Sequence, residues 1–366
     1  MIQKMRLWNA MQKVKGDAML GIGIIGCGNI SRMHADAIST INNATLVAVS
    51  SRSEHKAEQL ANRMNCDYHL DYHQLLSRSD ITIVMICTPN QTHLQIALDA
   101  VAAGKHIIVE KPLANNLADV DTMINACKKA KLKLTSIFQH RFNPAMLKLK
   151  QAVDDGLLGR INFGGCYEKI YRGDSYFESS PGRGTWAGDG GGVVIMNAIH
   201  YIDSLQFIMG PAVEVFSYAA TLAHDDIEVE DVSSSVIKFA NGALGTIEAS
   251  SAAFPKLHSR LEINGDKGSV VIENHRLKEW RIQDNDMQLH PLYGDLINQG
   301  QYANKGAQLE PSLRPNVVAE QINDFVLAVL HDRAPYVSAD SARHSLAIVY
   351  AIYESAKTGK AVKLGQ

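Results

Sequence analysis

The stretch Leu20-Gly21-Ile22-Gly23-Ile24-Ile25, followed directly by Gly26-Cys27-Gly28-Asn29-Ile30-Ser31, decides the fold of this chain. Its first half is a short apolar run that is typical of a buried strand, and a segment with helical periodicity follows its second half. A glycine-rich turn between a strand and a helix is the usual place for the pyrophosphate of a dinucleotide. The stretch therefore predicts the first strand and first helix of a dinucleotide-binding domain.

Two registers of the glycine fingerprint fit these letters. The earlier one, Gly21-x-Gly23-x-x-Gly26, places the phosphate turn inside the strand, whereas the later one uses Gly26 and Gly28 with Ser31 in the third place. Only the later register has a strand before it and a helix after it, so we prefer it. A G-x-G alone is weak evidence, and a bare strand-to-helix turn is the alternative interpretation.

A second apolar segment ends at Ser50, about 20 residues past the glycines, where an acidic residue would bind the ribose of NAD. Here the sequence has Ser51 and Arg52 instead. Loss of the acid removes repulsion against a 2'-phosphate, and Arg52 is able to pair with one, or it simply faces water. We therefore expect NAD(H) as the cofactor and leave NADP(H) open.

Strands continue to alternate with helices as far as residue 139, and this order predicts right-handed crossovers and a doubly wound parallel sheet. We expect further strands near Tyr68 and at 81–87, 106–109 and 132–138, with helices at 56–64, 92–103 and 117–130. Residues 19–139 are thus a predicted Rossmann domain, preceded by an extension over residues 1–18.

Ligands of such sheets bind at the carboxyl ends of the strands. Lys111 follows the 106–109 strand, and Pro112 stiffens the chain after it, so its ammonium group is directed into the cleft. The expected cofactor-binding residues are Gly26, Gly28, Asn29, Ile30, Ser51, Arg52, Thr88, Asn90, His93, Glu110 and Gln139.

The character of the chain changes after residue 139. Segments at 164–170, 213–221, 229–239, 243–250, 260–263 and 269–272 look like strands with few helices between them, and Asn241-Gly242 marks a tight hairpin. We expect an α+β domain with a large open, mainly antiparallel sheet over residues 140–338. A loop at 283–312 and amphipathic helices at 317–330 and 339–357 complete it, with residues 339–366 packing back toward the Rossmann domain.

An open sheet needs cover on its second face, and a second copy of the chain would provide it. We therefore expect a homo-oligomer. In residues 1–18, Leu7, Trp8 and Met11 are candidates for a contact within that oligomer, although a loose tail is the simpler alternative.

Composition excludes several classes of protein. The 366 residues are 46% hydrophobic with a formal charge of -2, which is typical of a globular protein without a basic face for nucleic acid. Five scattered cysteines without a C-x-x-C pair argue against disulfides or zinc, and the histidines have no companion carboxylates at ligand spacing, so we expect no metal. We found no apolar run near the ~20 residues of a membrane span and no signal peptide, and we expect a cytoplasmic protein without a membrane partner.

The acid/base group is expected after the run Gly188-Asp189-Gly190-Gly191-Gly192. In the helical stretch that follows, Asn197, His200 and Asp203 recur at three-residue spacing, so they share one face. A single histidine on an apolar helix is more often a core residue. The glycines, the neighbouring Asn197 and a dinucleotide domain that still lacks its acid/base favour His200 as the catalytic group.

Taken together, Gly26-Cys27-Gly28-Asn29-Ile30, Thr88-Pro89-Asn90-x-x-His93, Glu110-Lys111-Pro112 and Gly190-Gly191-Gly192 with His200-Tyr201-Ile202-Asp203 resemble the Gfo/Idh/MocA oxidoreductase family (glucose-fructose oxidoreductase / inositol dehydrogenase-like). The resemblance spans residues 19 to about 360. It implies a Rossmann domain plus an open-sheet domain that forms dimers or tetramers, and sugar or polyol substrates. It also implies that Lys111 binds the reacting hydroxyl and that His200 exchanges its proton.

One position departs from the family pattern. Many polyol-oxidising members have an aspartate four residues before the histidine, and this chain has Met196 there, beside Asn197. The variant resembles the branch that oxidises C3 of a hexopyranose or glycoside. Arginines and aromatic rings suit a sugar ring, although they also occur in ordinary packing. The expected substrate-binding residues are Asn197, Arg172, Tyr176, Arg183, Trp186 and Asp189.

The expected reaction is the transfer of hydride from a secondary alcohol to the nicotinamide. A tightly bound cofactor that is recycled within the site is one form that this reaction can take. His200, with a reference pKa of ~6.5, takes the hydroxyl proton, and Lys111 stabilises the developing alkoxide. One alternative substrate is a UDP-N-acetylamino-sugar uronate, for which Arg141, Arg160, Arg172 and Arg183 are available. The alternative from another class is a non-catalytic NAD(P)-sensing regulator, against which the presence of both Lys111 and His200 argues.

Overall fold

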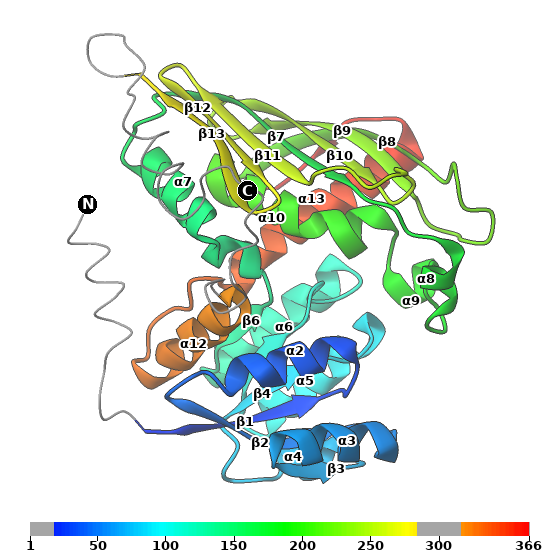
Figure 1. Cartoon of the computed structure of the whole chain (residues 1–366), viewed down its shortest axis with the longest axis vertical. Helices are drawn as coiled ribbons and strands as arrows, with labels where there is room; N and C mark the ends of the chain where they lie inside the picture. The colour runs from blue at the N-terminus through cyan, green and yellow to red at the C-terminus, as the bar shows by residue number, and fades with distance from the viewer. Residues whose placement is uncertain (1–17, 284–315, 366) are drawn as a thin grey trace.

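Two sheets lie one above the other along the long axis of the molecule (Figure 1). The structure, a computed structural model, describes residues 18–283 and 316–365. The suggested contact residues Leu7, Trp8 and Met11 and nearly all of the predicted 283–312 loop lie outside the described residues, so those expectations stay predictions.

The first sheet is the predicted parallel Rossmann sheet, and in the described part of the chain it has six strands in the order β3-β2-β1-β4-β5-β6. The strands are β1 (Leu20–Ile25), β2 (Ala44–Ser50), β3 (Asp67–His69), β4 (Ile83–Ile86), β5 (His106–Val109) and β6 (Leu134–Ser136). The helices and turns are α2 (Asn29–Ile38), α3 (Glu54–Met64), α4 (Tyr72–Leu76), η1 (Asn90–Thr92), α5 (His93–Ala102), α6 (Leu117–Ala130) and η2 (Gln139–Phe142). The fold class of this half is confirmed.

Helices cover both faces of this sheet. All four residues of β4, Ile83–Ile86, are fully buried, which explains why its sequence is continuously apolar rather than alternating. The early glycine register also has a structural explanation. A Cβ atom on Gly21 would lie 1.8 Å from the carbonyl oxygen of Asp80, so Gly21 is required by strand packing and not by a phosphate.

The second sheet is open and mainly antiparallel, as predicted. Its order among the described residues is β13-β12-β11-β7-β10-β9-β8-β14, and β7 and β10 are its parallel pair. The strands are β7 (Ile161–Lys169), β8 (Ala212–Ala220), β9 (Val232–Phe239), β10 (Leu244–Ser250), β11 (Arg260–Gly265), β12 (Gly268–Glu273), β13 (Arg276–Ile282) and β14 (Val362–Lys363). The helices are α7 (Pro144–Asp154), α8 (Asp174–Glu178), α9 (Trp186–Asp189), η3 (Val194–Ala198), α10 (Ile199–Met209), α12 (Val317–Leu330) and α13 (Ala339–Thr358).

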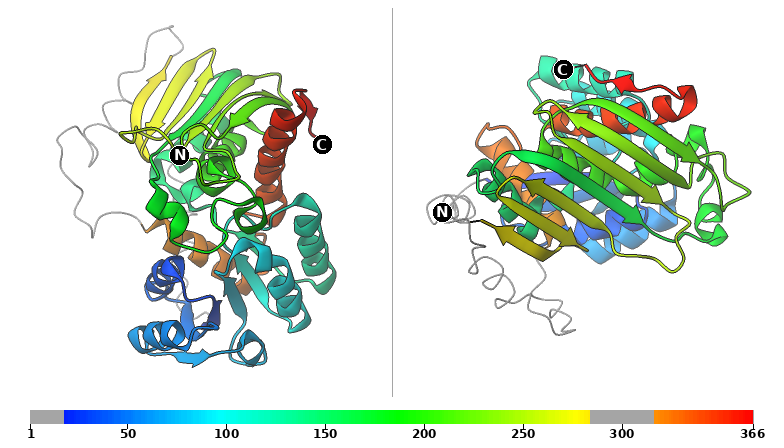
Figure 2. Two further views of the ribbon diagram at one scale, coloured as in Figure 1. Left: turned by 90° about the vertical axis from the view of Figure 1, so that its right-hand side faces the viewer. Right: turned by 90° about the horizontal axis from the view of Figure 1, so that it is seen from above.

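The two faces of this sheet differ. Helices α10 and α13 lie between it and the Rossmann layer, whereas the view from above shows its outer face without a described helix over it (Figure 2). Strand β13 was not predicted, because its sequence is mostly charged and only Trp280 and Ile282 of the strand are buried. It is the edge strand, where such a pattern is tolerated.

Helix α12 has the predicted bounds but packs on the Rossmann layer. Its Ile322 and Phe325 belong to the same buried cluster as Ile24 of β1 and Ile38 of α2. The sequence-based division placed this helix with residues 140–338. The domain boundaries stay a prediction, but by packing α12 extends the first layer rather than the second.

The stretch Trp186–Met209 is long and apolar enough to cross a membrane by length and composition, contrary to the expectation that no run came close. In the fold, 72% of its most apolar window is buried inside the protein. A core helix of a globular domain passes the same test, and α10 occupies such a position between the two sheets (Figure 1).

A buried ion pair joins the two layers. Arg141 of η2 donates from Nε and Nη2 to the carboxylate of Asp203 in α10 (2.8 and 2.6 Å), and Ser345 of α13 donates to the same carboxylate (2.7 Å). Both charged side chains are almost fully buried. Arg141 is therefore not available to an anionic substrate, and Asp203 does not share the site with His200, because the two residues satisfy each other in the core.

Candidate active site

Lys111 connects the two layers at the carboxyl end of β5. Its Nζ donates a hydrogen bond to the carbonyl oxygen of Met196 in η3 (2.7 Å), and its backbone N–H donates to Oε2 of Glu110 (2.9 Å). The Lys111–Pro112 peptide bond is cis. Burial lowers the pKa of Lys111, while the charges of Glu110 and Asp189 oppose that shift. Lys111 thus lies at a strand end and contacts η3 of the second half of the chain, and its catalytic role stays a prediction.

Glu110 is held in place by a histidine that the sequence did not single out. Its Oε1 lies 2.5 Å from Nε2 of His34, and both residues are buried. Burial opposes ionisation of Glu110, but the His34 hydrogen bond and the charges of His34 and Lys111 outweigh it and keep the pKa of Glu110 below its ordinary value. Glu110 thus orients the Lys111 backbone. His34 lies on the buried face of α2, three residues after the buried Ser31. This helical spacing is the sequence feature that could have indicated that His34 points inward.

His200 is in the first turn of α10, directly after the π-helical turn η3. Its Nδ1 is buried and has no hydrogen-bond partner among the described residues. Burial, followed by the charge of Lys111, lowers the pKa of His200 to about 3, well below the reference value assumed from sequence. The imidazole is therefore neutral near pH 7 and has a free nitrogen with which to accept a proton.

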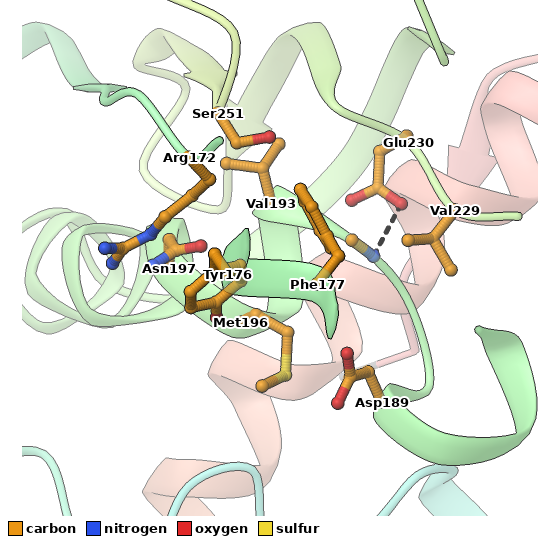
Figure 3. A pocket seen from close by; sticks show the side chains of 11 residues that line it. Arg172, Tyr176, Phe177, Asp189, Val193, Met196, Asn197, Val229, Glu230 and Ser251 are labelled. Carbon is orange, nitrogen blue, oxygen red and sulfur yellow. Dashed lines mark hydrogen bonds between the residues drawn. The ribbon is translucent and has the colours of Figure 1, made fainter. Parts of the chain in front are cut away.

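A pocket of about 280 Å³, a volume that includes space open to solvent, is lined by Met196, whose carbonyl oxygen accepts from Lys111 (Figure 3). Its lining residues are Arg172, Tyr176, Phe177, Asp189, Gly192, Val193, Met196, Asn197, Val229, Glu230 and Ser251. From the Rossmann side, the Nδ2 of Asn90 donates to the carbonyl oxygen of Asp189 (3.2 Å) and lies 3.8 Å from the Met196 sulfur. The pocket therefore sits between the strand ends of the first sheet and the loops of the second.

Two arginines stack on one tyrosine at this pocket. The guanidinium carbons of Arg172 and Arg183 lie 4.6 and 4.4 Å from the centre of the Tyr176 ring, and Arg183 donates to Oγ of Ser179 (2.8 Å). Neither arginine forms an ion pair with a carboxylate in the described part of the chain, and the Nε atoms of both are buried without a partner there. The pair presents two positive charges and an aromatic face at the predicted substrate side.

Asp189 lines the pocket and Trp186 does not. Oδ2 of Asp189 accepts from the backbone N–H of Gly184 (2.9 Å), and burial raises the pKa of Asp189, against the effects of that bond and of Arg183. The indole of Trp186 instead donates to the carbonyl oxygen of Glu228 (3.1 Å) and packs edge-on against Tyr353. Trp186 thus fixes the α9 turn, while Phe177, which we did not predict, lines the pocket.

Glu230 holds the glycine run and was also missed. Its carboxylate accepts from the backbone N–H groups of Gly192 (2.8 Å) and Val194 (2.9 Å) and from the Tyr353 hydroxyl (3.1 Å). The Gly192 bond is the dashed line in Figure 3. Burial raises the pKa of Glu230, and these hydrogen bonds oppose the shift. Nothing in the sequence connects position 230 with position 192, because the contact arises where the segment between β8 and β9 packs against the glycine run.

The turn before α2 fits the pyrophosphate of a dinucleotide. Gly28 is the N-cap of α2, no side chain caps the helix, and no acidic residue lies in its first turn. No atom lies within 4 Å of a Cβ built on Gly28, so the helix N-terminus is open to an anion, and Gly26 turns the chain with φ +102°. Asn29 and Ile30 begin the helix there, and the later register of the fingerprint fits this geometry.

The other predicted cofactor residues lie at the ends of neighbouring strands. Ser51 and Arg52 follow β2, Arg52 is exposed, and Gln139 follows β6 with its Oε1 buried and unpartnered among the described residues. His93 has a different role. It is fully buried, and its ring nitrogens contact the carbonyl oxygens of Thr88 (2.9 Å) and Pro112 (3.0 Å), so it ties two strand ends together rather than facing the cleft.

Arg160, the last of the arginines considered for an anionic substrate, precedes β7. The pocket residue Arg172 lies beyond the other end of that nine-residue strand, so Arg160 is remote from the site. In the described residues no group of three or more His, Cys, Asp or Glu side chains is arranged to hold a metal ion.

Comparisons with known proteins agree with this geometry. Residues 20–138 match the model of the oxidoreductase family with an NAD-binding Rossmann fold, and residues 146–271 match the Gfo/Idh/MocA C-terminal domain. The chain is 29% identical over 348 residues to a myo-inositol 2-dehydrogenase of Thermotoga maritima, covering 94% of this chain and 98% of that protein. It is 27% identical to a levoglucosan dehydrogenase of Pseudarthrobacter phenanthrenivorans, covering 72% and 76% of the two chains.

Among solved structures, the WlbA dehydrogenase from Bordetella pertussis in complex with NADH and UDP-GlcNAcA superposes with a TM-score of 0.86. It is 28% identical, and the match covers 96% of this chain and all of that one. Two matching domain models, in the order in which the two sheets occur, and a full-length structural match identify the family. The chain belongs to the Gfo/Idh/MocA family of oxidoreductases and has its NAD-binding Rossmann domain.

Proposed function

We propose that this protein is a nicotinamide-dependent dehydrogenase that oxidises a secondary hydroxyl, at C3, of a hexopyranose or glycoside to the keto sugar. The observation that carries the proposal is the pairing of Lys111 with η3: its ammonium group lies at the Met196 carbonyl, between the open turn of α2 and the pocket. No carboxylate occupies position 196, so the hydroxyl is held by Lys111 and Asn197 and loses its proton to His200.

The roles follow from the chemistry of these groups. A cofactor held by Gly26, Gly28 and the α2 N-terminus supplies a hydride acceptor. Lys111 stabilises negative charge that develops on the alcohol oxygen, because its half-buried ammonium group is already held in position at the Met196 carbonyl. His200 is neutral and accepts the hydroxyl proton. Glu110 and His34 fix the backbone from which Lys111 projects.

The test locates the carbon that loses hydride. Methyl glucosides carrying deuterium at C3 or at C2 are incubated with the purified protein and NAD⁺, and the reduced cofactor is analysed by mass spectrometry. We expect deuterium in the cofactor only from the C3-labelled sugar. Transfer from C2, or no reduction with any sugar in a panel of glycosides, inositols and UDP-sugars, contradicts the proposal.

A second candidate substrate has its own support. Arg172 and Arg183 stand beside the pocket without a carboxylate partner in the described chain, which suits the carboxylate of a UDP-N-acetylamino-sugar uronate. The solved WlbA relative was crystallised with UDP-GlcNAcA. Of the four arginines first considered, only these two remain. If the substrate is this uronate, Arg172→Met and Arg183→Met raise KM for it about 10-fold or more, since each charged hydrogen bond contributes about 1.5–3 kcal/mol, with kcat much less affected.

The neutral glycoside and the uronate are separated by the same two variants. If a neutral glycoside is the substrate, KM for it changes little in Arg172→Met, because no anion is lost from the contact. The regulator alternative predicts cofactor binding without any turnover, and the preformed Lys111 and His200 argue against it.

The open sheet supports a homodimer. Its outer face has Phe163, Tyr218, Val236 and Leu244 among the exposed large hydrophobic residues, and Val236 pairs across the sheet with Phe216. An exposed apolar face of this kind is typical of an interface, and a second copy of the same sheet matches it by symmetry.

A further inference from the structure

Three histidine rings follow one another from the first turn of α10 to the surface. The ring centres of His200 in α10 and His140 in η2 are 4.7 Å apart, and those of His140 and His275, in the turn between β12 and β13, are 4.3 Å apart. Tyr201 lies edge-on to His140 at 5.2 Å and parallel to His275 at 6.0 Å. We call His200, His140 and His275 the histidine row.

The environment of the row changes along its length. His275 is exposed in the described part of the chain, whereas the Nδ1 atoms of His140 and His200 are buried and have no partner among the described residues. The charged groups that face the row are Lys111 and Glu110 at its inner end and Lys256 at its outer end. Burial, followed by the neighbouring histidines and Lys111, lowers the pKa of His140 well below its ordinary value.

A proton is disfavoured at the inner end of this row. Each alcohol oxidation releases one proton, and on His200 it would lie near the positive Lys111, on a half-buried ring whose Nδ1 has no partner among the described residues. The nearby carboxylate, Glu110, is already occupied by His34 and the Lys111 backbone, and position 196 is a methionine. The site therefore needs an exit for the proton before the next turnover.

We propose that His140 and His275 conduct the substrate proton between His200 and bulk water, an inference that rests on the proposed role of His200 as base. The hydroxyl O–H bond breaks as its proton bonds to His200, and the hydride leaves with its electron pair to the nicotinamide. The proton then passes from His200 to His140, from His140 to His275 and from His275 to water or buffer. An imidazole suits this path because it accepts at one nitrogen and releases from the other.

The outer histidine can be removed without disturbing its turn. His275 has φ +68°, a left-handed conformation that asparagine adopts more readily than most residues, so His275→Asn keeps the backbone preference. The turn is held by Asn274, whose Oδ1 accepts from the Ser259 N–H (3.2 Å) and whose N–H donates to the Ser259 carbonyl (2.9 Å). His73→Gln, an exposed histidine in α4, is the matched control.

The kinetic test compares turnover at low and high buffer concentration. In dilute, non-imidazole buffer we expect His275→Asn to lower kcat on the order of 10-fold, below the ~10²- to 10⁴-fold typical of a direct acid/base residue. Added imidazole restores kcat, and the first, single turnover of NAD⁺ reduction keeps its rate. A kcat equal to that of His73→Gln, or a loss that imidazole does not restore, overturns the proposal.

A second readout needs neither sugar nor cofactor and so separates this inference from the proposed function. With ¹⁵N-labelled histidine, NMR measures how fast the ring N–H of His200 exchanges its proton with water. We expect slower exchange in His275→Asn and in His140→Phe, which keeps the ring shape. Unchanged exchange in both folded variants overturns the proton path, whereas a protein that oxidises no sugar but shows slower exchange contradicts only the proposed function.

Discussion

The two sheets of this molecule differ in how many of their faces are covered by helices. The Rossmann sheet is covered on both faces, and its β4 and β5 cores are almost entirely buried, whereas among the described residues the open sheet has helices on one face only (Figures 1 and 2). Lys111 projects from the end of a fully supported strand. The pocket side chains Arg172, Tyr176 and Asp189 come from loops and short helices beyond the open sheet. The Rossmann sheet thus positions Lys111, whereas His200 and the residues proposed for substrate recognition come from the half of the chain that contains the open sheet.

The buried ion pair between Arg141 and Asp203, which connects the two layers, gives the largest expected effect on stability. Asp203→Ala leaves Arg141 buried without its carboxylate partner, so we expect unfolding free energy to fall by about 3–5 kcal/mol. Urea unfolding measures this loss. Asp340→Ala, which removes an exposed pairing with Lys128, is the control and should change little. If Asp203→Ala and the unaltered protein have the same free energy of unfolding, the ion pair does not stabilise the contact between the two layers.

Removal of the Lys111 charge tests the contribution of the Rossmann sheet to the proposed reaction. Lys111→Met keeps the length of the side chain but not its ammonium group, and we expect kcat for sugar oxidation to fall about 10²- to 10³-fold. Cofactor affinity should stay within a few fold, because the contacts predicted to hold the pyrophosphate are at Gly26 and Gly28. Lys129→Met on the surface of α6 is the control. Wild-type turnover in Lys111→Met removes the proposed role.

Sequence patterns could predict the elements whose position depends on the spacing of nearby residues. The strand ends that position Lys111, the helix that carries His200 and the bounds of α12 and α13 all follow from apolar periodicity and glycine turns. The preference for the later glycine register is supported by the close packing of Gly21 on Asp80.

Contacts between distant segments could not be predicted in this way. Glu230 contacts Gly192, and His140 contacts His275, because the tertiary fold brings a connecting segment and a hairpin turn to these positions, and no period in the sequence indicates either contact. The pKa of His200 was likewise misjudged, since a reference value contains neither burial nor the charge of Lys111. Arg141 looked available because its partner, Asp203, is 62 residues away.

The pKa of His200 in α10 depends on the charge of Lys111 in the Rossmann half, and this dependence can be tested by titration. Its pKa is lowered to about 3, so the neutral, active form should persist as pH falls through 6.5, and kcat/KM should lose its His200-dependent part only toward pH 3. In Lys111→Met the second cause of the shift is absent, so NMR titration should find a higher His200 pKa. An acid limb centred near 6.5 in the unaltered protein contradicts the buried environment.

The same shifts make acid destabilising. His200 and His140 have folded-state pKa values below the unfolded value of ~6.5, so the unfolded chain binds more protons. Their contribution to stability is fully present above pH ~6.5 and declines as pH falls toward about 3. Thermal unfolding of His140→Phe should therefore show a weaker dependence on pH over this window than the unaltered protein, which a constant difference in Tm between the two would contradict.

The exposed face of the open sheet gives the smallest expected effect on a single chain. Val236 points outward from β9, where alternate residues are buried, so Val236→Lys should change monomer stability by no more than about 0.5 kcal/mol. The same change places a charge within the proposed interface, and we expect sedimentation to show a shift from dimer to monomer. Thr45→Lys, on an exposed position of β2 in the Rossmann sheet, should leave the oligomer intact. If both variants sediment alike, the open face is not the interface, and the difference between the sheets concerns the pocket alone.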